Sequence, residues 1–214
     1  MNSRPPVRAL LIDLGGVVVR DPRPIVLRML GPSLRDDPSR LKESYYQLSL
    51  DLDSGSIDMR EMYDRLQRRF RLDVPYPRFR AWLTDRSLTL YPGVVRALKH
   101  LKSRGAVRIV LASNVSMPVW RALKRKFRLD RLADEAALSC QLGVLKPDPR
   151  FYRAALRLAR TERQAVLYVD DVRSNVLAAR RLGIRSVWVR GPRSTLRALR
   201  QLAAEPRSSR TPSG

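Results

Sequence analysis

Short apolar runs of strand length alternate with helical patterns over the second half of this 214-residue chain. The predicted strands cover residues 107–112, 135–139, 166–169 and 185–190, and the predicted helices cover residues 93–104, 117–128, 149–160, 173–182 and 194–204. A further apolar run, residues 7–14, supplies one more strand. Strands that alternate with helices build a parallel sheet with helices on both faces. The sequence therefore predicts an α/β protein with a Rossmann-like, doubly wound parallel sheet.

The stretch that follows the first predicted strand has a different pattern. Residues 24–86 contain no convincing strand, and helical patterns occur at 24–30, 38–50, 57–70 and 76–85, with Ser56 as the expected N-cap of the third. Pro22 and Pro24 interrupt the chain in front of these helices, as expected of a hinge. We therefore expect a core domain of residues 1–20 and 88–204, a helical cap domain of residues 21–87 and a disordered tail of residues 205–214.

The composition is that of a globular protein with an unusual charge. Cys140 is the single cysteine, and no apolar run approaches the roughly 18–20 residues of a membrane helix. With no signal-peptide pattern at Met1, these features predict a cytoplasmic monomer or homodimer without a membrane partner. The formal net charge of +23 favours anionic ligands. Because the arginines are spread along the chain rather than gathered in one basic arm, nucleic acid is the less favoured partner.

Polar side chains follow several of the predicted strands. Asp13 ends the first strand, Ser113 and Asn114 end the second, Asp170 and Asp171 end the fourth, and Lys146 lies in the loop before the 149–160 helix. The carboxyl ends of parallel strands share one edge of a sheet, so these groups are expected to converge. Carboxylates crowded in this way repel one another unless a hard cation such as Mg²⁺ lies between them. A hydroxyl and an ammonium group beside them suit the oxygens of a phosphoryl group.

These stretches, in this order, resemble those of the haloacid dehalogenase-like hydrolases, and the resemblance covers about residues 7–190. Residues 139–149 and 169–175 are most similar to the branch that includes the N-terminal phosphatase domain of soluble epoxide hydrolase. The sequence Asp-Leu-Gly-Gly-Val at residues 13–17 is closer to bacterial sugar-phosphatase-like members of that branch.

The resemblance implies a Mg²⁺-dependent phosphatase that acts on a small phosphorylated metabolite, for example a sugar phosphate. Asp13 would be the nucleophile that forms an aspartyl-phosphate. Asp13, the carbonyl oxygen of Gly15 and Asp171 would hold Mg²⁺, with Asp170 acting through water. In the same scheme, the phosphoryl group is bound by Ser113, Asn114 and Lys146, and Asn175 supports the acidic loop.

One position departs from the family pattern. The usual phosphatase motif has a second aspartate two residues after the nucleophile, which protonates the leaving group, and this chain has Gly15 there. Such acid–base help is typically worth 10²–10⁴-fold. Three readings stay open at this point: a phosphatase that uses good leaving groups or takes an acid from elsewhere, a 2-haloacid dehalogenase-like hydrolase, or a catalytically weak phosphate-binding or scaffold protein with an acidic partner. Asp21, beside the hinge, is one candidate acid; His100, the single histidine, is expected on a helix surface far from the site.

Overall fold

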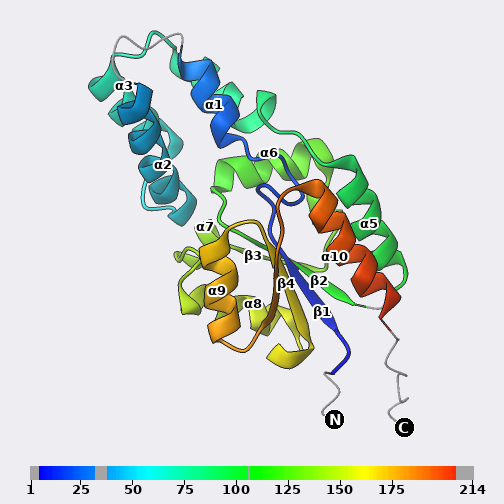
Figure 1. Ribbon diagram of the computed structural model, residues 1–214. Helices are drawn as coiled ribbons and strands as arrows, with labels where there is room; N and C mark the ends of the chain where they lie inside the picture. Colours follow the sequence, from blue (N-terminus) through cyan, green and yellow to red (C-terminus); the bar gives the residue numbers. More distant parts are fainter. Residues whose placement is uncertain (1–4, 32–37, 106, 206–214) are drawn as a thin grey trace.

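The computed structural model describes residues 5–31, 38–105 and 107–205, and within them five parallel strands form one sheet in the order β3-β2-β1-β4-β5 (Figure 1). The strands are β1 (Ala9–Ile12), β2 (Arg108–Ser113), β3 (Glu135–Leu138), β4 (Val166–Asp170) and β5 (Arg185–Trp188). Each lies within or next to a predicted strand, and the predicted doubly wound parallel sheet is confirmed.

Helices cover both faces of this sheet. Figure 1 shows α5 (Pro92–Ser103) and α10 (Pro192–Ala204) on one side, and α8 (Pro149–Ala159) and α9 (Arg173–Arg181) on the other. Two further helices follow strands, α6 (Met117–Phe127) after β2 and the short α7 (Ser139–Leu142) after β3. The remaining turns are the 3₁₀ helices η3 (Leu129–Arg131) and η4 (Arg163–Ala165).

The central strand β1 is buried on both faces. Leu10 and Ile12 pack into the hydrophobic cluster under α5, α6 and α10, whereas Ala9 and Leu11 pack into the cluster under α8 and α9. This division follows from the two-residue repeat of a strand, whose side chains alternate between faces. Each fully buried Leu or Ile contributes roughly 1.5–3 kcal/mol to folding, so the strand that carries Asp13 at its end is fixed firmly.

The predicted helical stretch forms a group of its own beyond the carboxyl end of β1 (Figure 1). It contains α1 (Arg23–Leu30), α2 (Pro38–Ser54), α3 (Met59–Phe70), α4 (Tyr76–Ala81) and the π-helix η2 (Trp82–Arg86). These helices pack around a separate cluster that includes Tyr45, Met62 and Phe79. Among the described residues, every helix is too short or too polar to span a membrane.

One local prediction is wrong, and another lies mainly outside the described residues. Ser56 is not the N-cap of α3; Asp58 is, and its side chain accepts a hydrogen bond from the amide of Glu61. Asp58 has the extended backbone that an N-cap needs and lies immediately before the first helical residue. The predicted disordered tail falls mainly on residues 206–214, which are outside the described part of the chain.

Candidate active site

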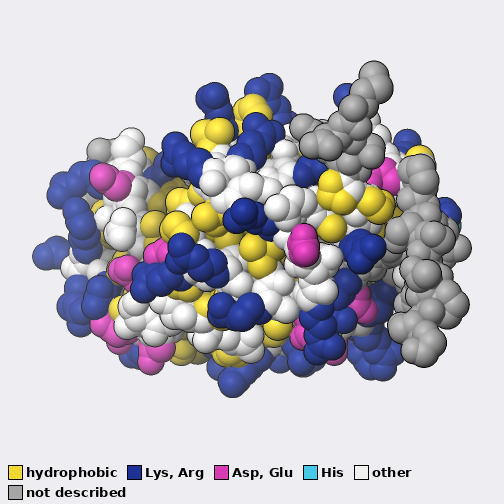
Figure 2. All heavy atoms as spheres, turned by 90° about the horizontal axis from the view of Figure 1, so that it is seen from below, with side chains coloured by type: hydrophobic (Ala, Val, Ile, Leu, Met, Phe, Trp, Pro, Cys, Tyr) yellow, Lys and Arg dark blue, Asp and Glu magenta, His cyan; other side chains and the backbone are white. Residues whose placement is uncertain are grey.

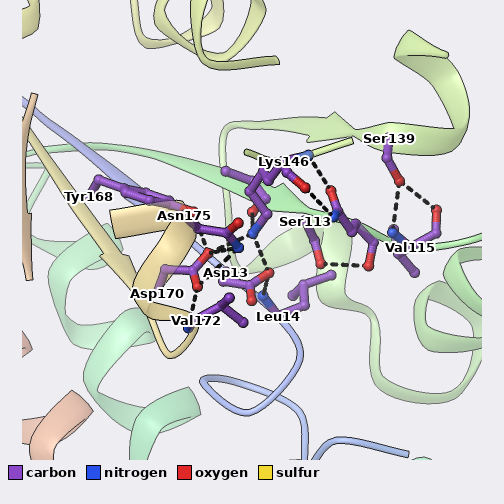
Figure 3. A network of polar contacts seen from close by, with 12 residues as sticks. Asp13, Leu14, Ser113, Val115, Ser139, Lys146, Tyr168, Asp170, Val172 and Asn175 are labelled. Carbon is purple, nitrogen blue, oxygen red and sulfur yellow. Dashed lines mark hydrogen bonds and ion pairs between the residues drawn. The ribbon is translucent and has the colours of Figure 1, made fainter. Parts of the chain in front are cut away.

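The polar side chains predicted at the strand ends meet at one edge of the sheet (Figure 3). Asp13 follows β1 directly, Ser113 is the last residue of β2, and Asp170 is the last residue of β4. The loop between α7 and α8 brings Lys146 to the same place. These groups lie in positions set by the rigid sheet, because three of them belong to, or adjoin, its three central strands.

Lys146 joins the two buried carboxylates. Its Nζ lies 2.9 Å from Asp13 Oδ1 and 2.8 Å from Asp170 Oδ2, and it donates to the carbonyl oxygen of Ala112 at 2.7 Å. An ammonium group has three hydrogens, so these contacts use all of them. The Lys146 side chain is 1% exposed. Burial by itself lowers the pKa of this ammonium, but the charges of Asp13 and Asp170 outweigh burial and raise it.

Asp170 is surrounded by donors. Besides Lys146, its carboxylate accepts hydrogen bonds from the hydroxyl of Tyr168, from the amide of Val172 at 2.7 Å, and from Asn175 Nδ2 at 3.2 and 3.3 Å. Burial opposes ionisation, but Lys146 and these donors hold the pKa of Asp170 below its usual value. Both oxygens of Asp170 are therefore occupied by protein donors.

Asp171, unlike Asp170, has a carboxylate oxygen without a protein donor among the described residues. Its Oδ1 atom is buried and has no hydrogen-bond partner in the described part of the chain. Burial, and then the charges of Asp13 and Asp170, raise the pKa of Asp171 to about 7. Carboxylate oxygens of Asp13, Asp170 and Asp171 lie within 4.8 Å of one another. A buried acceptor without a donor, next to two more carboxylates, fits a hard divalent cation, which prefers oxygen ligands.

Gly15 and Gly16 differ in whether a side chain would fit at their positions. Gly16 has a φ of +72°, and a Cβ there would lie 1.9 Å from Asp171 Oδ2, so a side chain at Gly16 would fill the space that Asp171 occupies. At Gly15, a Cβ would meet no heavy atom of the described residues within 4 Å. The structure therefore requires glycine at position 16. At position 15 it leaves open space, where the usual motif has a carboxylate.

Ser113 and Asn114 have distinct contacts. The Ser113 hydroxyl donates to the carbonyl oxygen of Asn114 at 3.4 Å, and its position beside Asp13 favours the ionised form of that carboxylate. The side chain of Asn114 forms a pair of bonds with the backbone of Lys146: Nδ2 donates to its carbonyl oxygen at 3.0 Å, and Oδ1 accepts from its amide at 2.8 Å. This amide pairing holds the Lys146 loop against the end of β2, a positioning contact that the sequence pattern does not reveal.

A cavity of about 630 Å³, which includes space open to solvent, lies next to these residues. It is lined mostly by apolar side chains, together with Gly15, Ser113, Asn114 and polar groups from the helical stretch. Its apolar lining residues are Leu14, Val19, Pro22, Leu52, Leu83, Leu88, Val115, Val119 and Leu123. Its acidic lining residues are Asp21 and Asp53. The hydroxyl oxygen of Ser116, another lining residue, is buried without a partner among the described residues.

Sequence reasoning missed Tyr168, Asp53 and Ser116. Tyr168 is two residues before Asp170 on β4, so the strand repeat places both side chains on one face, and that spacing is a usable signal. No comparable signal identifies Asp53 within a helix that contains several polar residues. His100 is exposed on α5 and is not among the residues that line the cavity, as expected.

Comparison with known proteins agrees with this arrangement. The family model described as haloacid dehalogenase-like hydrolase matches residues 7–183. The chain is 32% identical to drimenol cyclase drtB of Aspergillus calidoustus over 85% of its length, but it spans only 34% of that protein. It is 26% identical to sesquiterpene phosphatase astK of Aspergillus oryzae, over 91% of this chain and 96% of that one.

A solved structure has the same fold. It is a haloacid dehalogenase family enzyme from Bacteroides thetaiotaomicron in a magnesium complex, 21% identical, with a TM-score of 0.72 over 87% of this chain and 95% of the other. The match of the family model over most of the chain, on a fold whose strand ends carry the expected groups, shows that this protein belongs to the haloacid dehalogenase-like hydrolases and is an enzyme of that family.

Proposed function

We propose that this protein is a Mg²⁺-dependent phosphatase that hydrolyses a small phosphate monoester through an aspartyl-phosphate on Asp13. The observation that carries the proposal is the pairing of Asp13 with Lys146, next to an acidic cluster in which Asp171 Oδ1 has no donor in the described structure. A nucleophilic carboxylate must be held in one orientation, and Asp13 is held by Lys146 at 2.9 Å and by the amide of Leu14 at 2.7 Å.

The metal would be held by Asp13, Asp171 and the carbonyl oxygen of Gly15. Asp170 would act through water, because its oxygens already accept hydrogen bonds from the protein. The ion would offset the negative charge between the Asp13 carboxylate and the phosphate, and it would align the attack. This role also explains why Gly16 must lack a side chain, since a Cβ there would displace Asp171.

The other residues act on the phosphoryl group and on Asp13. Ser113 and the backbone of Asn114 would bind the phosphoryl oxygens, and the positive charge of Lys146 would stabilise the charge that develops on them. Lys146 also fixes the attacking carboxylate, since all three of its hydrogens point to Asp13, Asp170 and Ala112.

The cavity favours a substrate with an apolar organic group. Its apolar lining comes both from the core, for example Val119, and from the helical stretch, for example Leu52 and Leu83. A sugar phosphate would have to place several hydroxyl groups against these side chains, at a cost in desolvation. A terpenoid or other apolar alkyl phosphate fits better, in keeping with the name of the sesquiterpene phosphatase relative. We also propose that residues 21–87 form a cap domain over a core of residues 1–20 and 88–204.

The test is phosphate release from a panel of apolar alkyl phosphates, sugar phosphates and acetyl phosphate, with and without Mg²⁺. The proposal predicts Mg²⁺-dependent turnover that Asp13→Asn abolishes, while Asp130→Asn, an exposed aspartate on η3, leaves turnover unchanged. Turnover of no phosphoester, acetyl phosphate included, would overturn the proposal. In that case, halide release from 2-haloacids without metal would identify a dehalogenase, and salt-sensitive binding of nucleic acid would identify a scaffold.

A further inference from the structure

Hydrolysis of an alkyl phosphate needs a proton for the leaving oxygen, because an alkoxide is a poor leaving group at neutral pH. Gly15 has no side chain with which to supply one, and the space in front of it is open to the cavity. The donor must therefore be a group that reaches the same cavity from another element.

Most candidate groups near the cavity are unsuitable. Lys146 has a raised pKa and uses all three hydrogens within the protein, and Asp170 is held ionised with a lowered pKa. Asp21 accepts bonds from the backbone amide of Arg23 at 3.1 Å and from its guanidinium Nε at 2.9 Å. The Asp21 Oδ1 atom is therefore already engaged by Arg23.

Of the two acidic side chains that line the cavity, Asp53 remains, and the fold fixes it beside the site. It lies at the end of α2, where the Ser139 hydroxyl donates to its carbonyl oxygen at 2.5 Å. The backbone amide of Ser116, in the segment that follows Ser113, faces the Asp53 carboxyl group and favours its ionised form. The Ser139 contact holds the end of the helix against the start of α7. A carboxyl group of the helical stretch is thereby held in the cavity that Gly15 and Ser113 line.

We propose that the Asp53 carboxyl group donates the proton that the leaving oxygen needs, in the place of the missing side chain at Gly15. The inference rests on the proposed phosphatase function. As an Asp13 oxygen bonds to phosphorus, the bond from phosphorus to the alcohol oxygen breaks, and that oxygen takes the proton of Asp53. In the second step a water molecule attacks the phosphorus of the aspartyl-phosphate and gives a proton to the Asp53 carboxylate. Inorganic phosphate leaves, and Asp13 and protonated Asp53 are regenerated.

The surroundings of Asp53 support a protonated carboxyl group near neutral pH. The titratable groups that act on Asp53 and on its neighbours come from several segments: Asp13 after β1, Asp21 and Arg23 at the start of the helical stretch, Tyr45 on α2 and Cys140 on α7. Burial has the largest effect and raises the pKa of Asp53 to about 7, although Arg23 and the Ser116 amide oppose it. Asp53 can therefore carry a proton near neutral pH.

The test compares kcat/KM for phosphate esters with good and poor leaving groups in wild type and Asp53→Asn. We expect a loss of about 10²-fold or more for an alkyl phosphate and a change of no more than a few-fold for dinitrophenyl phosphate, whose leaving group needs no proton. The ratio of the two values within one variant does not depend on how much of the protein is folded. Asp51→Asn, on the same helix but outside the cavity, is the matched control and leaves both values unchanged.

Two further readouts separate proton donation from a structural role. In the wild type, kcat/KM for the alkyl phosphate falls as the pH rises through about 7, because the reactive form of Asp53 is protonated. This limb of the pH profile is absent in Asp53→Asn. Adding Gly15→Asp to Asp53→Asn restores turnover of the alkyl phosphate, because the backbone at Gly15 has room for a side chain.

The results distinguish this inference from the proposed function. An equal loss for both leaving groups in Asp53→Asn, or no loss for either, overturns the role of Asp53 while the phosphatase function stands. A wild type that hydrolyses neither ester overturns both.

Discussion

Among single residues, the carboxylate oxygens of the site differ in whether they accept hydrogen bonds from the protein. Asp170 is bound by Lys146, Tyr168 and Asn175, whereas Asp171 Oδ1 has no donor among the described residues. Two adjacent aspartates with the same side chain thus have different surroundings. Asp170 contacts Lys146, whereas Asp171 leaves an oxygen without a donor, which the proposed cation would use.

The two glycines give the first prediction. Gly16→Ala should destabilise the protein by at least about 1 kcal/mol, because alanine is disfavoured at positive φ and its Cβ would collide with Asp171 Oδ2. It should also abolish the increase in thermal stability that Mg²⁺ gives. Gly15→Ala is the control, and its free energy of unfolding should stay close to the wild-type value. Urea unfolding and thermal melts with and without Mg²⁺ measure both effects; equal behaviour of the two variants would contradict the account.

At the scale of elements, Ser139 connects the helical stretch to the core. Its hydroxyl donates to the carbonyl oxygen of Asp53 on α2 and accepts from the amide of Val115 at 3.0 Å. Ser139→Ala leaves that buried amide without its acceptor, which costs about 1–3 kcal/mol, and it frees the end of α2. We expect lower stability and a lower kcat/KM for alkyl phosphates.

A matched control for this prediction is Ser103→Ala. The Ser103 hydroxyl also donates to a carbonyl oxygen, that of His100 at 3.0 Å, but on the exposed side of α5. The Ser103→Ala substitution should therefore leave both the free energy of unfolding and kcat/KM close to their wild-type values. An unchanged free energy of unfolding in Ser139→Ala would show that the connection contributes nothing.

The elements also show how far the sequence could predict this structure. Strands such as β1 and β4 are buried on both faces, so they appear as continuous apolar runs, and the polar residue that ends each run marks the site. The short helix α7 lacks a repeat long enough to recognise. Asp53 and Asp51 are alike in sequence, and which of them faces the cavity depends on how α2 packs on the core. The predicted N-cap of α3, Ser56, lies two residues before the observed one, Asp58, because both are good capping residues.

At the scale of the whole molecule, the charge is the dominant property. Figure 2 shows Lys and Arg side chains spread over the face seen from below, with fewer acidic side chains between them. A net charge of +23 on a chain of this size draws small anions toward the surface without favouring any one binding patch. This field assists any phosphorylated substrate.

Such steering gives a prediction about salt. Raising the ionic strength from about 0.01 to 0.1 M shortens the screening length from about 30 to 10 Å, so kcat/KM for an alkyl phosphate dianion should fall while kcat stays constant. An aminoalkyl phosphate, whose ammonium group cancels one negative charge, should show a weaker dependence. Identical slopes for the two substrates would exclude steering by the net charge.

The proposed mechanism requires a covalent bond between Asp13 and phosphorus. It is tested most directly by acid quenching the enzyme during turnover of acetyl phosphate with Mg²⁺, followed by mass spectrometry of the peptide that contains Asp13. We expect a phosphoryl group on Asp13 in the wild type, absent without Mg²⁺ and absent in Asp13→Asn. Turnover with no phosphoryl group on Asp13, or with one on a different residue, would contradict it.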